Sequence, residues 1–163
     1  MPTSFPEQIP VLLQTITRLQ PKTILDIGCG NGKMGHLVKE YFHDTRIDAL
    51  EVFPKYIKDC HKENYTKITI GNALEVDIPQ YDLYLIIDVL EHWDKEPAKE
   101  LLRRLTKMGS VLISTPRSVG EQGAEYGNEW ERHVSQWLEF EFSEFNAEGL
   151  PSDFAFIQLL PKQ

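Results

Sequence analysis

The residue types best suited to bind a ligand lie in a glycine-rich run near the start of the chain. Residues 28–32 read Gly-Cys-Gly-Asn-Gly and follow an apolar stretch, residues 23–27, that predicts a buried strand. Glycine permits the backbone conformations of a sharp turn and lets a ligand approach the main chain closely. The helix predicted after this turn presents unpaired N–H groups to an electronegative ligand. These residues therefore predict a binding loop in preference to an ordinary tight turn.

An acidic residue, Glu51, ends the second predicted strand, where a carboxylate can accept hydrogen bonds from ribose hydroxyls. The alternative is a solvated carboxylate at a strand end, which the upstream glycine run disfavours. Residues 30–35, Gly-Asn-Gly-Lys-Met-Gly, also satisfy the pattern of dinucleotide-binding loops, so these residues alone leave a nicotinamide cofactor open. A phosphate-binding P-loop is excluded because the sequence has no Gly-Lys-Ser or Gly-Lys-Thr.

Four elements, in order along the chain, resemble the class I S-adenosylmethionine (SAM)-dependent methyltransferases. Residues 26–32 match the Asp-x-Gly-x-Gly-x-Gly motif of that family, and Glu51 stands where members carry an acid. Residues 71–73, Gly-Asn-Ala, stand in the place of a common Gly-Asp-Ala element. Residues 88–92, Asp-Val-Leu-Glu-His, match the end of the fourth strand. The resemblance covers roughly residues 20–116 and is more specific than any single glycine motif.

The resemblance implies SAM as the cofactor and assigns it residues that follow the first four strands. Asp26 and the glycine backbone would face the methionine part, Glu51 would bind the ribose, and Asp88 would lie beside the sulfonium. Asn72 replaces the commoner aspartate, and its carbonyl can still accept a hydrogen bond from the adenine amino group. The expected cofactor-binding residues are Asp26, Gly28, Cys29, Gly30, Glu51, Val52, Asn72, Ala73, Asp88 and Val89.

We expect the methyl acceptor to be recognised by the opening helix and by the segment that follows the fifth strand, residues 116–136, which the resemblance places above the cofactor. A loop this long in a compact domain is more often functional than idle. Residues 133–137, His-Val-Ser-Gln-Trp, resemble a His-x-x-x-aromatic element of many small members. His133 is accordingly the candidate catalytic residue that contacts or deprotonates the acceptor; the alternative is a histidine that pins the loop by hydrogen bonds. The expected substrate-binding residues are His92, Tyr126, Trp130 and Arg132, whereas Trp137 fits core packing at least as well.

No metal site is expected from the spacing of possible ligands. His36, His43 and His61 are scattered, and Cys29 and Cys60 form neither metal nor redox spacing. Asp88 with a second carboxylate resembles the Mg²⁺ ligands of some oxygen methyltransferases, but the sequence shows no supporting cluster.

These residues require a scaffold that brings strand ends to one edge. Apolar patterning predicts strands alternating with helices, which implies a mainly parallel sheet. We expect one domain, residues 1–163, of the α/β class: a Rossmann-like, mainly parallel sheet of six to seven strands with helices on both faces. The family sheet has seven strands, and residues 137–145, which favour a helix, also fit a strand. The predicted strands are 23–27, 46–51, 67–70, 81–88, 111–113 and 154–160, and the predicted helices 9–19, 34–42, 54–61 and 94–105.

Composition narrows the class of partner. The 163 residues are 41% hydrophobic and carry a net charge of -8, which suits a globular domain and disfavours nucleic-acid binding. The sequence shows no signal peptide and no apolar run of the about 20 residues that span a bilayer, so a cytoplasmic protein without membrane contact is expected. A small-molecule acceptor is therefore favoured, and nothing indicates the oligomeric state.

Two other functions are compatible with parts of the sequence. An NAD(P)-dependent oxidoreductase would explain the glycines and Glu51 but leaves residues 88–92 unexplained, and no Tyr-x-x-x-Lys dyad is present. A non-catalytic methyltransferase-like partner subunit would keep the fold, because a fold does not by itself establish an activity.

Overall fold

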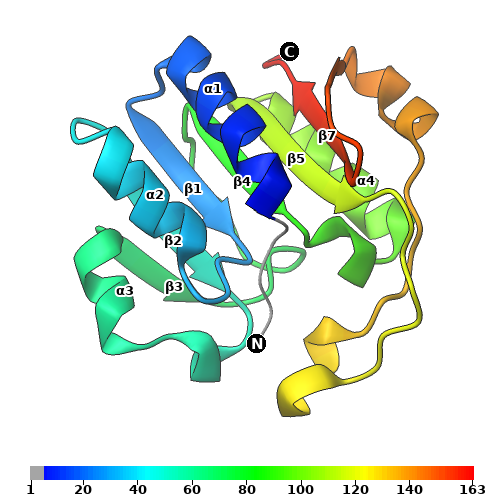
Figure 1. The fold of residues 1–163 in the computed structure, drawn as a ribbon, viewed down its shortest axis with the longest axis horizontal. Helices are drawn as coiled ribbons and strands as arrows, with labels where there is room; N and C mark the ends of the chain where they lie inside the picture. The colour runs from blue at the N-terminus through cyan, green and yellow to red at the C-terminus, as the bar shows by residue number, and fades with distance from the viewer. Residues whose placement is uncertain (1–5) are drawn as a thin grey trace.

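A single seven-stranded sheet forms the centre of the molecule. The computed structural model describes residues 6–163, apart from the side chains of residues 59 and 60. The strand order is β3-β2-β1-β4-β5-β7-β6; β1 to β5 are parallel, whereas β7 is antiparallel to β5 and to β6 (Figure 1). The strands are β1 (Thr23–Ile27), β2 (Arg46–Glu51), β3 (Lys67–Ile70), β4 (Leu83–Ile87), β5 (Ser110–Pro116), β6 (Glu148–Leu150) and β7 (Ala155–Leu160). The expected α/β architecture is confirmed.

Helices cover both faces of this sheet. The α-helices are α1 (Ile9–Leu19), α2 (Lys33–Tyr41), α3 (Asp59–Asn64) and α4 (Lys95–Thr106). The 3₁₀ helices are η1 (Pro6–Gln8), η2 (Pro54–Tyr56), η3 (Leu90–His92), η4 (Glu125–Gly127), η5 (Glu129–Glu131) and η6 (Glu139–Phe145). One predicted helix, residues 54–61, is two shorter elements, η2 and α3. Asp94 occupies the N-cap position of α4, but its side chain makes no capping hydrogen bond.

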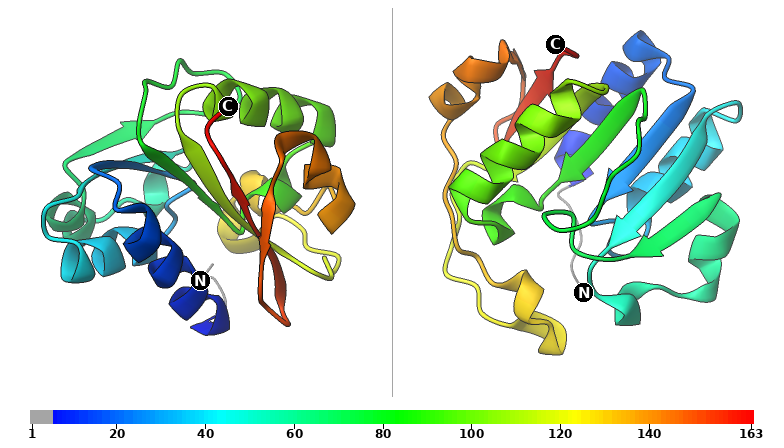
Figure 2. Two further views of the ribbon diagram at one scale, coloured as in Figure 1. Left: turned by 90° about the horizontal axis from the view of Figure 1, so that it is seen from above. Right: turned by 180° about the vertical axis from the view of Figure 1, so that it is seen from behind.

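Two hydrophobic cores, one on each face, hold the layers together. On one face, Ile16 of α1 and Val38 of α2 pack with strand residues such as Leu85. On the other, Leu101 of α4 and Trp137 pack with the alternate strand residues, and Figure 2 shows α4 lying across the sheet when it is viewed from behind. Because β4 is covered on both faces, all five of its residues are buried, which explains its unbroken apolar sequence.

The antiparallel end of the sheet corrects the count of six strands. Strand β6 has only three residues and was not visible as a strand in the sequence. Residues 139–145 form the 3₁₀ helix η6, so the helical interpretation of this stretch is confirmed. Trp137 is fully buried and stacks on Phe142 with ring centroids 5.5 Å apart, which makes it a core residue.

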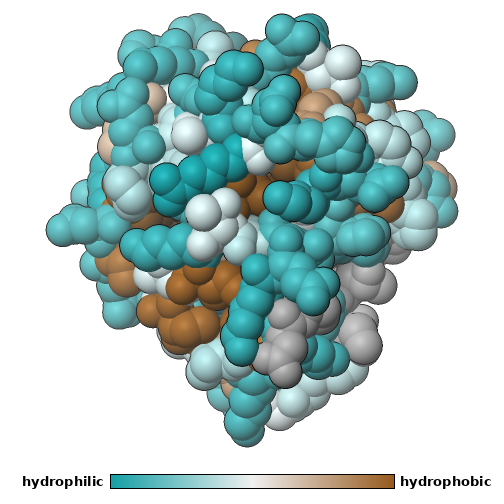
Figure 3. Space-filling model, turned by 90° about the vertical axis from the view of Figure 1, so that its left-hand side faces the viewer, coloured by the Kyte–Doolittle hydropathy of each residue, from teal (hydrophilic) through white to brown (hydrophobic). Residues whose placement is uncertain are grey.

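The strand order reverses direction between β1 and β4, which lie side by side at the centre of the sheet. In open α/β sheets, ligands bind beyond the carboxyl ends of the strands at such a point. The side of the molecule that carries β3 is mainly hydrophilic, with a hydrophobic patch at the lower left of the view in Figure 3. Within residues 6–163, no helix combines the length and the apolar character needed to cross a bilayer.

Candidate functional site

A cavity of about 670 Å³ lies at the carboxyl ends of the parallel strands. This volume falls within the range of small-molecule and cofactor sites. The turns that follow β1, β2, β3 and β4 line one side, and the segment that follows β5 lines the other. The expected site residues that line it are Gly28, Cys29, Gly30, Glu51, Val52, Asn72, Ala73, Asp88, Val89, His92, Tyr126, Trp130 and His133. Thirteen of the fifteen expected residues therefore come together, while Asp26 and Arg132 lie outside the lining.

The turn after β1 depends on its glycines. Gly28, Gly30 and Gly32 have φ values of 73°, 51° and 75°, a backbone region that other residues rarely adopt. A Cβ atom at Gly28 would lie 2.5 Å from a methyl carbon of Val89, so the glycine lets the segment after β4 pack against this turn. A Cβ atom at Gly30 would meet no described atom within 4 Å. Because Gly30 lines the cavity, its backbone forms an open cradle for a ligand.

Glu51 is fixed at the end of β2 by two backbone donors. The N–H of Gly30 donates to its Oε2 atom at 2.9 Å, and the N–H of Phe53 donates to Oε1 at 2.8 Å. The residue is only 4% exposed, and this burial raises the pKa of its carboxyl above the ordinary value. Glu51 therefore connects the first turn to the second and keeps a carboxylate at the cavity wall.

Asp26 faces away from the cavity, behind the first turn. The Tyr65 hydroxyl donates to its carboxylate at 2.5 Å, and the same hydroxyl accepts from the Gly35 N–H at 3.1 Å. Burial raises the pKa of Asp26 to about 7. In this structure the aspartate links β1 to α2 and to the chain after α3, and its expected contact with the cofactor stays a prediction.

Asp88 ends β4 in a strained conformation. Its φ of 53° lies in the left-handed region, where a non-glycine residue is uncommon and where functional sites often store strain. The buried Gln8 side chain donates to its Oδ2 atom at 2.7 Å and accepts from the Ser114 hydroxyl. Gln8 could not be identified from the sequence, because a glutamine before the first helix resembles any polar surface residue. None of the α1 residues lines the cavity, so the described structure gives no support to the expected role of the opening helix in recognising the acceptor.

The cavity lining is strongly acidic. It contains six carboxylates against one lysine, Lys33; the six are Glu51, Asp88, Glu91, Glu121, Glu125 and Glu131. A ligand with a positively charged sulfonium is attracted by such a wall, whereas the two negative charges of a dinucleotide pyrophosphate are repelled. The open glycine backbone at Gly30 and the acidic lining fit SAM better than NAD.

The wall opposite the β1 and β2 turns is formed by η3 and the segment after β5; we call it the acceptor side after its expected role. Hydrogen bonds between η3 and residues 132–137 hold it together. The Leu90 carbonyl accepts from the Ser135 hydroxyl at 3.1 Å and from the Trp137 indole N–H at 3.0 Å. The Glu91 carbonyl accepts from the backbone N–H groups of Val134 and Ser135 at 2.9 and 3.1 Å. The His-x-x-x-aromatic element thus has a physical role: Ser135 and buried Trp137 anchor the segment that carries His133.

Three further residues of the acceptor side differ in their surroundings. Tyr126 and Trp130 line the cavity and are also exposed at its mouth, which fits aromatic walls for an acceptor. Arg132 pairs instead with Glu129 at 2.8 Å on the surface, so its side chain does not support the expected substrate contact. The backbone carbonyl of Arg132 accepts a hydrogen bond from the Nδ1 atom of His92 at 3.2 Å.

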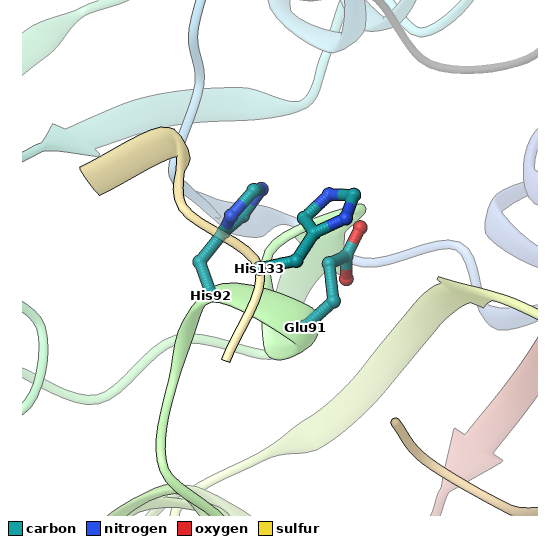
Figure 4. A group of neighbouring side chains, drawn as sticks. All are labelled: Glu91, His92 and His133. Carbon is teal, nitrogen blue, oxygen red and sulfur yellow. The ribbon is translucent and has the colours of Figure 1, made fainter. Parts of the chain in front are cut away.

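Glu91, His92 and His133 form a cluster at this side of the cavity (Figure 4). One ligand atom from each lies within 4.8 Å of the others, and the two imidazole centroids are 5.0 Å apart. Burial and the neighbouring Asp88 raise the pKa of Glu91 to about 8, and burial lowers the pKa of His92. Sequence reasoning missed Glu91 although it lies in the Asp-Val-Leu-Glu-His element, because no spacing rule relates residues 91–92 to His133.

Comparisons with known proteins show to which proteins this chain is similar. The family model described as "Methyltransferase domain" matches residues 25–110. The ubiquinone biosynthesis O-methyltransferase of Alkalilimnicola ehrlichii is 30% identical over 135 residues, which are 74% of this chain and 55% of that protein. The malonyl-[acyl-carrier protein] O-methyltransferase of Anoxybacillus flavithermus is 27% identical over 107 residues, 58% of this chain and 39% of that protein. This chain thus spans about half the length, or less, of these two curated relatives.

The fold is also found in solved structures. Human N-acetylserotonin methyltransferase in complex with SAM superimposes with a TM-score of 0.70 at 13% identity, over 96% of this chain and 52% of the human one. At this identity the likeness concerns the fold alone. It supports the fold described above.

Proposed function

The chain belongs to the class I SAM-dependent methyltransferases, and we propose that it transfers the methyl group of SAM to an oxygen atom of a small molecule. The observation that carries the proposal is the acidic cavity over the glycine turn, in which one wall suits the cofactor and the other an acceptor. Both curated relatives are named O-methyltransferases, which supports an oxygen acceptor.

The wall formed by the turns after β1 to β4 would bind the cofactor, which when bound supplies a methyl group already activated by a sulfonium. Glu51 would accept hydrogen bonds from the ribose hydroxyls, and the open backbone at Gly30 would lie against the ligand. Asn72 already accepts from the Leu74 N–H at 3.1 Å, and its carbonyl has a second lone pair for the adenine amino group. Asp88 would place a carboxylate near the positive charge.

The opposite wall would hold the acceptor. Exposed Tyr126 and Trp130 provide apolar surface at the mouth of the cavity, and His133 provides a polar atom farther in. The Nδ1 atom of His133 lies 2.8 Å from the Gly120 carbonyl and must donate to it, so a neutral ring carries its lone pair on Nε2. We assign to His133 the role of engaging the acceptor hydroxyl through Nε2. Alignment of the acceptor with the methyl group then supplies much of the rate enhancement.

The test is a methyl-transfer assay with SAM and a panel of phenols, aliphatic alcohols, carboxylic acids and amines. Formation of S-adenosylhomocysteine that depends on an oxygen acceptor supports the proposal. Turnover with amines and not with any oxygen compound would refute the oxygen assignment while retaining methyl transfer. A His133→Ala variant that keeps full turnover with the acceptor found would refute the role of that histidine.

A further inference from the structure

We propose that Glu91, His92 and His133 form a binding site for one divalent transition-metal ion on the acceptor side of the cavity. All three residues line the cavity, and their ligand atoms lie within 4.8 Å of one another. Figure 4 shows the two imidazole rings and the carboxylate on the same side of η3, with His133 arriving from the segment after η5. The placement of an acceptor at this ion rests on the proposed function; the binding of the ion does not.

The hydrogen bonds of both histidines match those of metal ligands. The Nδ1 atom of His92 lies 3.2 Å from the Arg132 carbonyl, and the Nδ1 atom of His133 lies 2.8 Å from the Gly120 carbonyl. A carbonyl only accepts, so each Nδ1 carries the proton and each neutral ring has its lone pair on Nε2. Histidines that bind metals commonly donate their other N–H to a backbone carbonyl or a carboxylate, which fixes the ring. Both rings are therefore in a tautomer whose Nε2 lone pair can bind a metal ion.

Glu91 is also held by a neighbour. The hydroxyl of fully buried Thr115 donates to its Oε2 atom at 3.1 Å, and the residue is itself buried. A buried carboxylate without a cationic partner is costly, and a bound cation would offset that cost. No lysine or arginine side chain is recorded in a salt bridge with Glu91 within residues 6–163. The cluster thus combines two oriented nitrogen ligands with an oriented oxygen ligand.

The backbone supports the same geometry. The Glu91 carbonyl accepts from Val134 and Ser135, the two residues after His133, so both ligand-bearing segments are tied together. Tetrahedral coordination at about 2.0–2.2 Å places ligand atoms about 3.4 Å apart. Closing the cluster from 4.8 Å to that spacing requires side-chain movements of about 1 Å, which leave these backbone hydrogen bonds in place.

The ligand set indicates the class of metal. Two imidazoles and one carboxylate suit Zn²⁺, Fe²⁺, Co²⁺ or Mn²⁺, and catalytic sites with three protein ligands keep a position open. Here the open position would face the cavity, where an acceptor oxygen could bind the ion. With the ion bound, the Nε2 atom of His133 would hold the ion, so this histidine would engage the acceptor oxygen through the ion and not directly. An oxygen bound to a metal ion is deprotonated more easily than a free one.

The experiment is a titration of the chelator-treated full chain with Co²⁺ and, separately, Zn²⁺, followed by calorimetry and by the visible spectrum of Co²⁺. We expect one ion per chain and the absorption bands of a nitrogen- and oxygen-ligated Co²⁺ ion. The His133→Gln variant should bind the ion at least tenfold more weakly, since losing even a supporting partner of a ligand costs 10- to 100-fold. The His43→Gln variant is the matched control, because His43 also directs Nδ1 to a carbonyl, that of Lys39, but is exposed on the surface.

Two outcomes would overturn the proposal: no binding by the wild-type chain at 100-fold excess of either ion, or equal binding by wild type and His133→Gln. Thermal melting of each variant checks its fold, and His92→Gln replaces His133→Gln if the latter does not fold. SAM titrations of the same samples keep the two proposals apart. If SAM binds and neither metal ion does, the proposed metal site is wrong and the proposed methyl transfer stands. If a metal ion binds and SAM does not, the metal site stands and the proposed methyl transfer is contradicted.

Discussion

Replacing Gly30 by alanine separates the conformational need for glycine from its role as a ligand cradle. Gly30 has a φ of 51°, and a Cβ atom there would meet no described atom within 4 Å. Alanine therefore fits sterically in the ligand-free protein and costs about 1–2 kcal/mol for its left-handed backbone. For a domain of this size, that lowers the melting temperature by about 2–8 °C.

The effect on cofactor binding should be larger than this strain explains. The new methyl group would project into the cavity that Gly30 lines, where the account places the cofactor. Overpacking of a filled site costs about 1–3 kcal/mol, so the Kd for SAM should rise about 5- to 150-fold. Calorimetric titration of the variant with SAM measures this change.

Gly127→Ala provides the matched control. Gly127 has a φ of 70°, also has open space around a Cβ atom within the described chain, and does not line the cavity. It should show a similar loss of melting temperature with a Kd for SAM within about twofold of the wild type. If Gly30→Ala binds SAM as tightly as Gly127→Ala, the glycine turn does not form the cofactor site.

Three other changes have defined outcomes. Glu51→Ala removes the proposed acceptor of the ribose hydroxyls and should raise the Kd for SAM about 10- to 150-fold, since a hydrogen bond to a charged group contributes about 1.5–3 kcal/mol; an unchanged calorimetric Kd would contradict this. Burial raises the pKa of Asp26 to about 7, so between pH 4 and 7 the folded state binds one proton more than the unfolded state, and the stabilisation from this group is lost as pH rises. Relative to Asp26→Asn, the wild type should lose about 1.4 kcal/mol of unfolding free energy per pH unit in that window. Urea denaturation of both proteins at several pH values measures this loss, and the same pH dependence in both would refute the assignment. Trp137→Ala removes a fully buried ring and the hydrogen bond to the Leu90 carbonyl, and should destabilise the fold by about 3–5 kcal/mol; a loss below about 1 kcal/mol in the same assay would show that the ring is not a core residue.

The parallel half of the sheet could be predicted because apolar residues mark each of its strands, on both faces in the buried strands β1 and β4. The predicted bounds 23–27, 46–51 and 67–70 coincide with β1, β2 and β3. The candidate residues after these strands could be predicted because a glycine-rich turn and an acid at a strand end are recognisable from the local sequence alone. Strand β6 could not be found, since three residues with no alternation pair only because β7 offers them an edge. In η6, the alternating aromatics also fitted a strand, but Phe142 is buried whereas Phe140 is 69% exposed, in agreement with the favoured helix.

The acceptor side was less accessible to sequence reasoning. His133 was found through its motif, but its neighbours are set by tertiary hydrogen bonds between η3 and residues 132–137. Those contacts join Glu91 and His92 to a residue about 40 positions later, which no ligand-spacing rule covers. The family motif implied that Asp26 contacts the cofactor; in the structure its carboxylate accepts from the Tyr65 hydroxyl, and the cofactor contact stays a prediction.

The most direct test of the central claim is isothermal titration of the wild-type chain with SAM, S-adenosylhomocysteine and NAD in parallel. The acidic lining and the open glycine cradle predict micromolar binding of the two adenosyl sulfur compounds and no binding of NAD. Binding of NAD with none of the other two would contradict the account and restore a dehydrogenase.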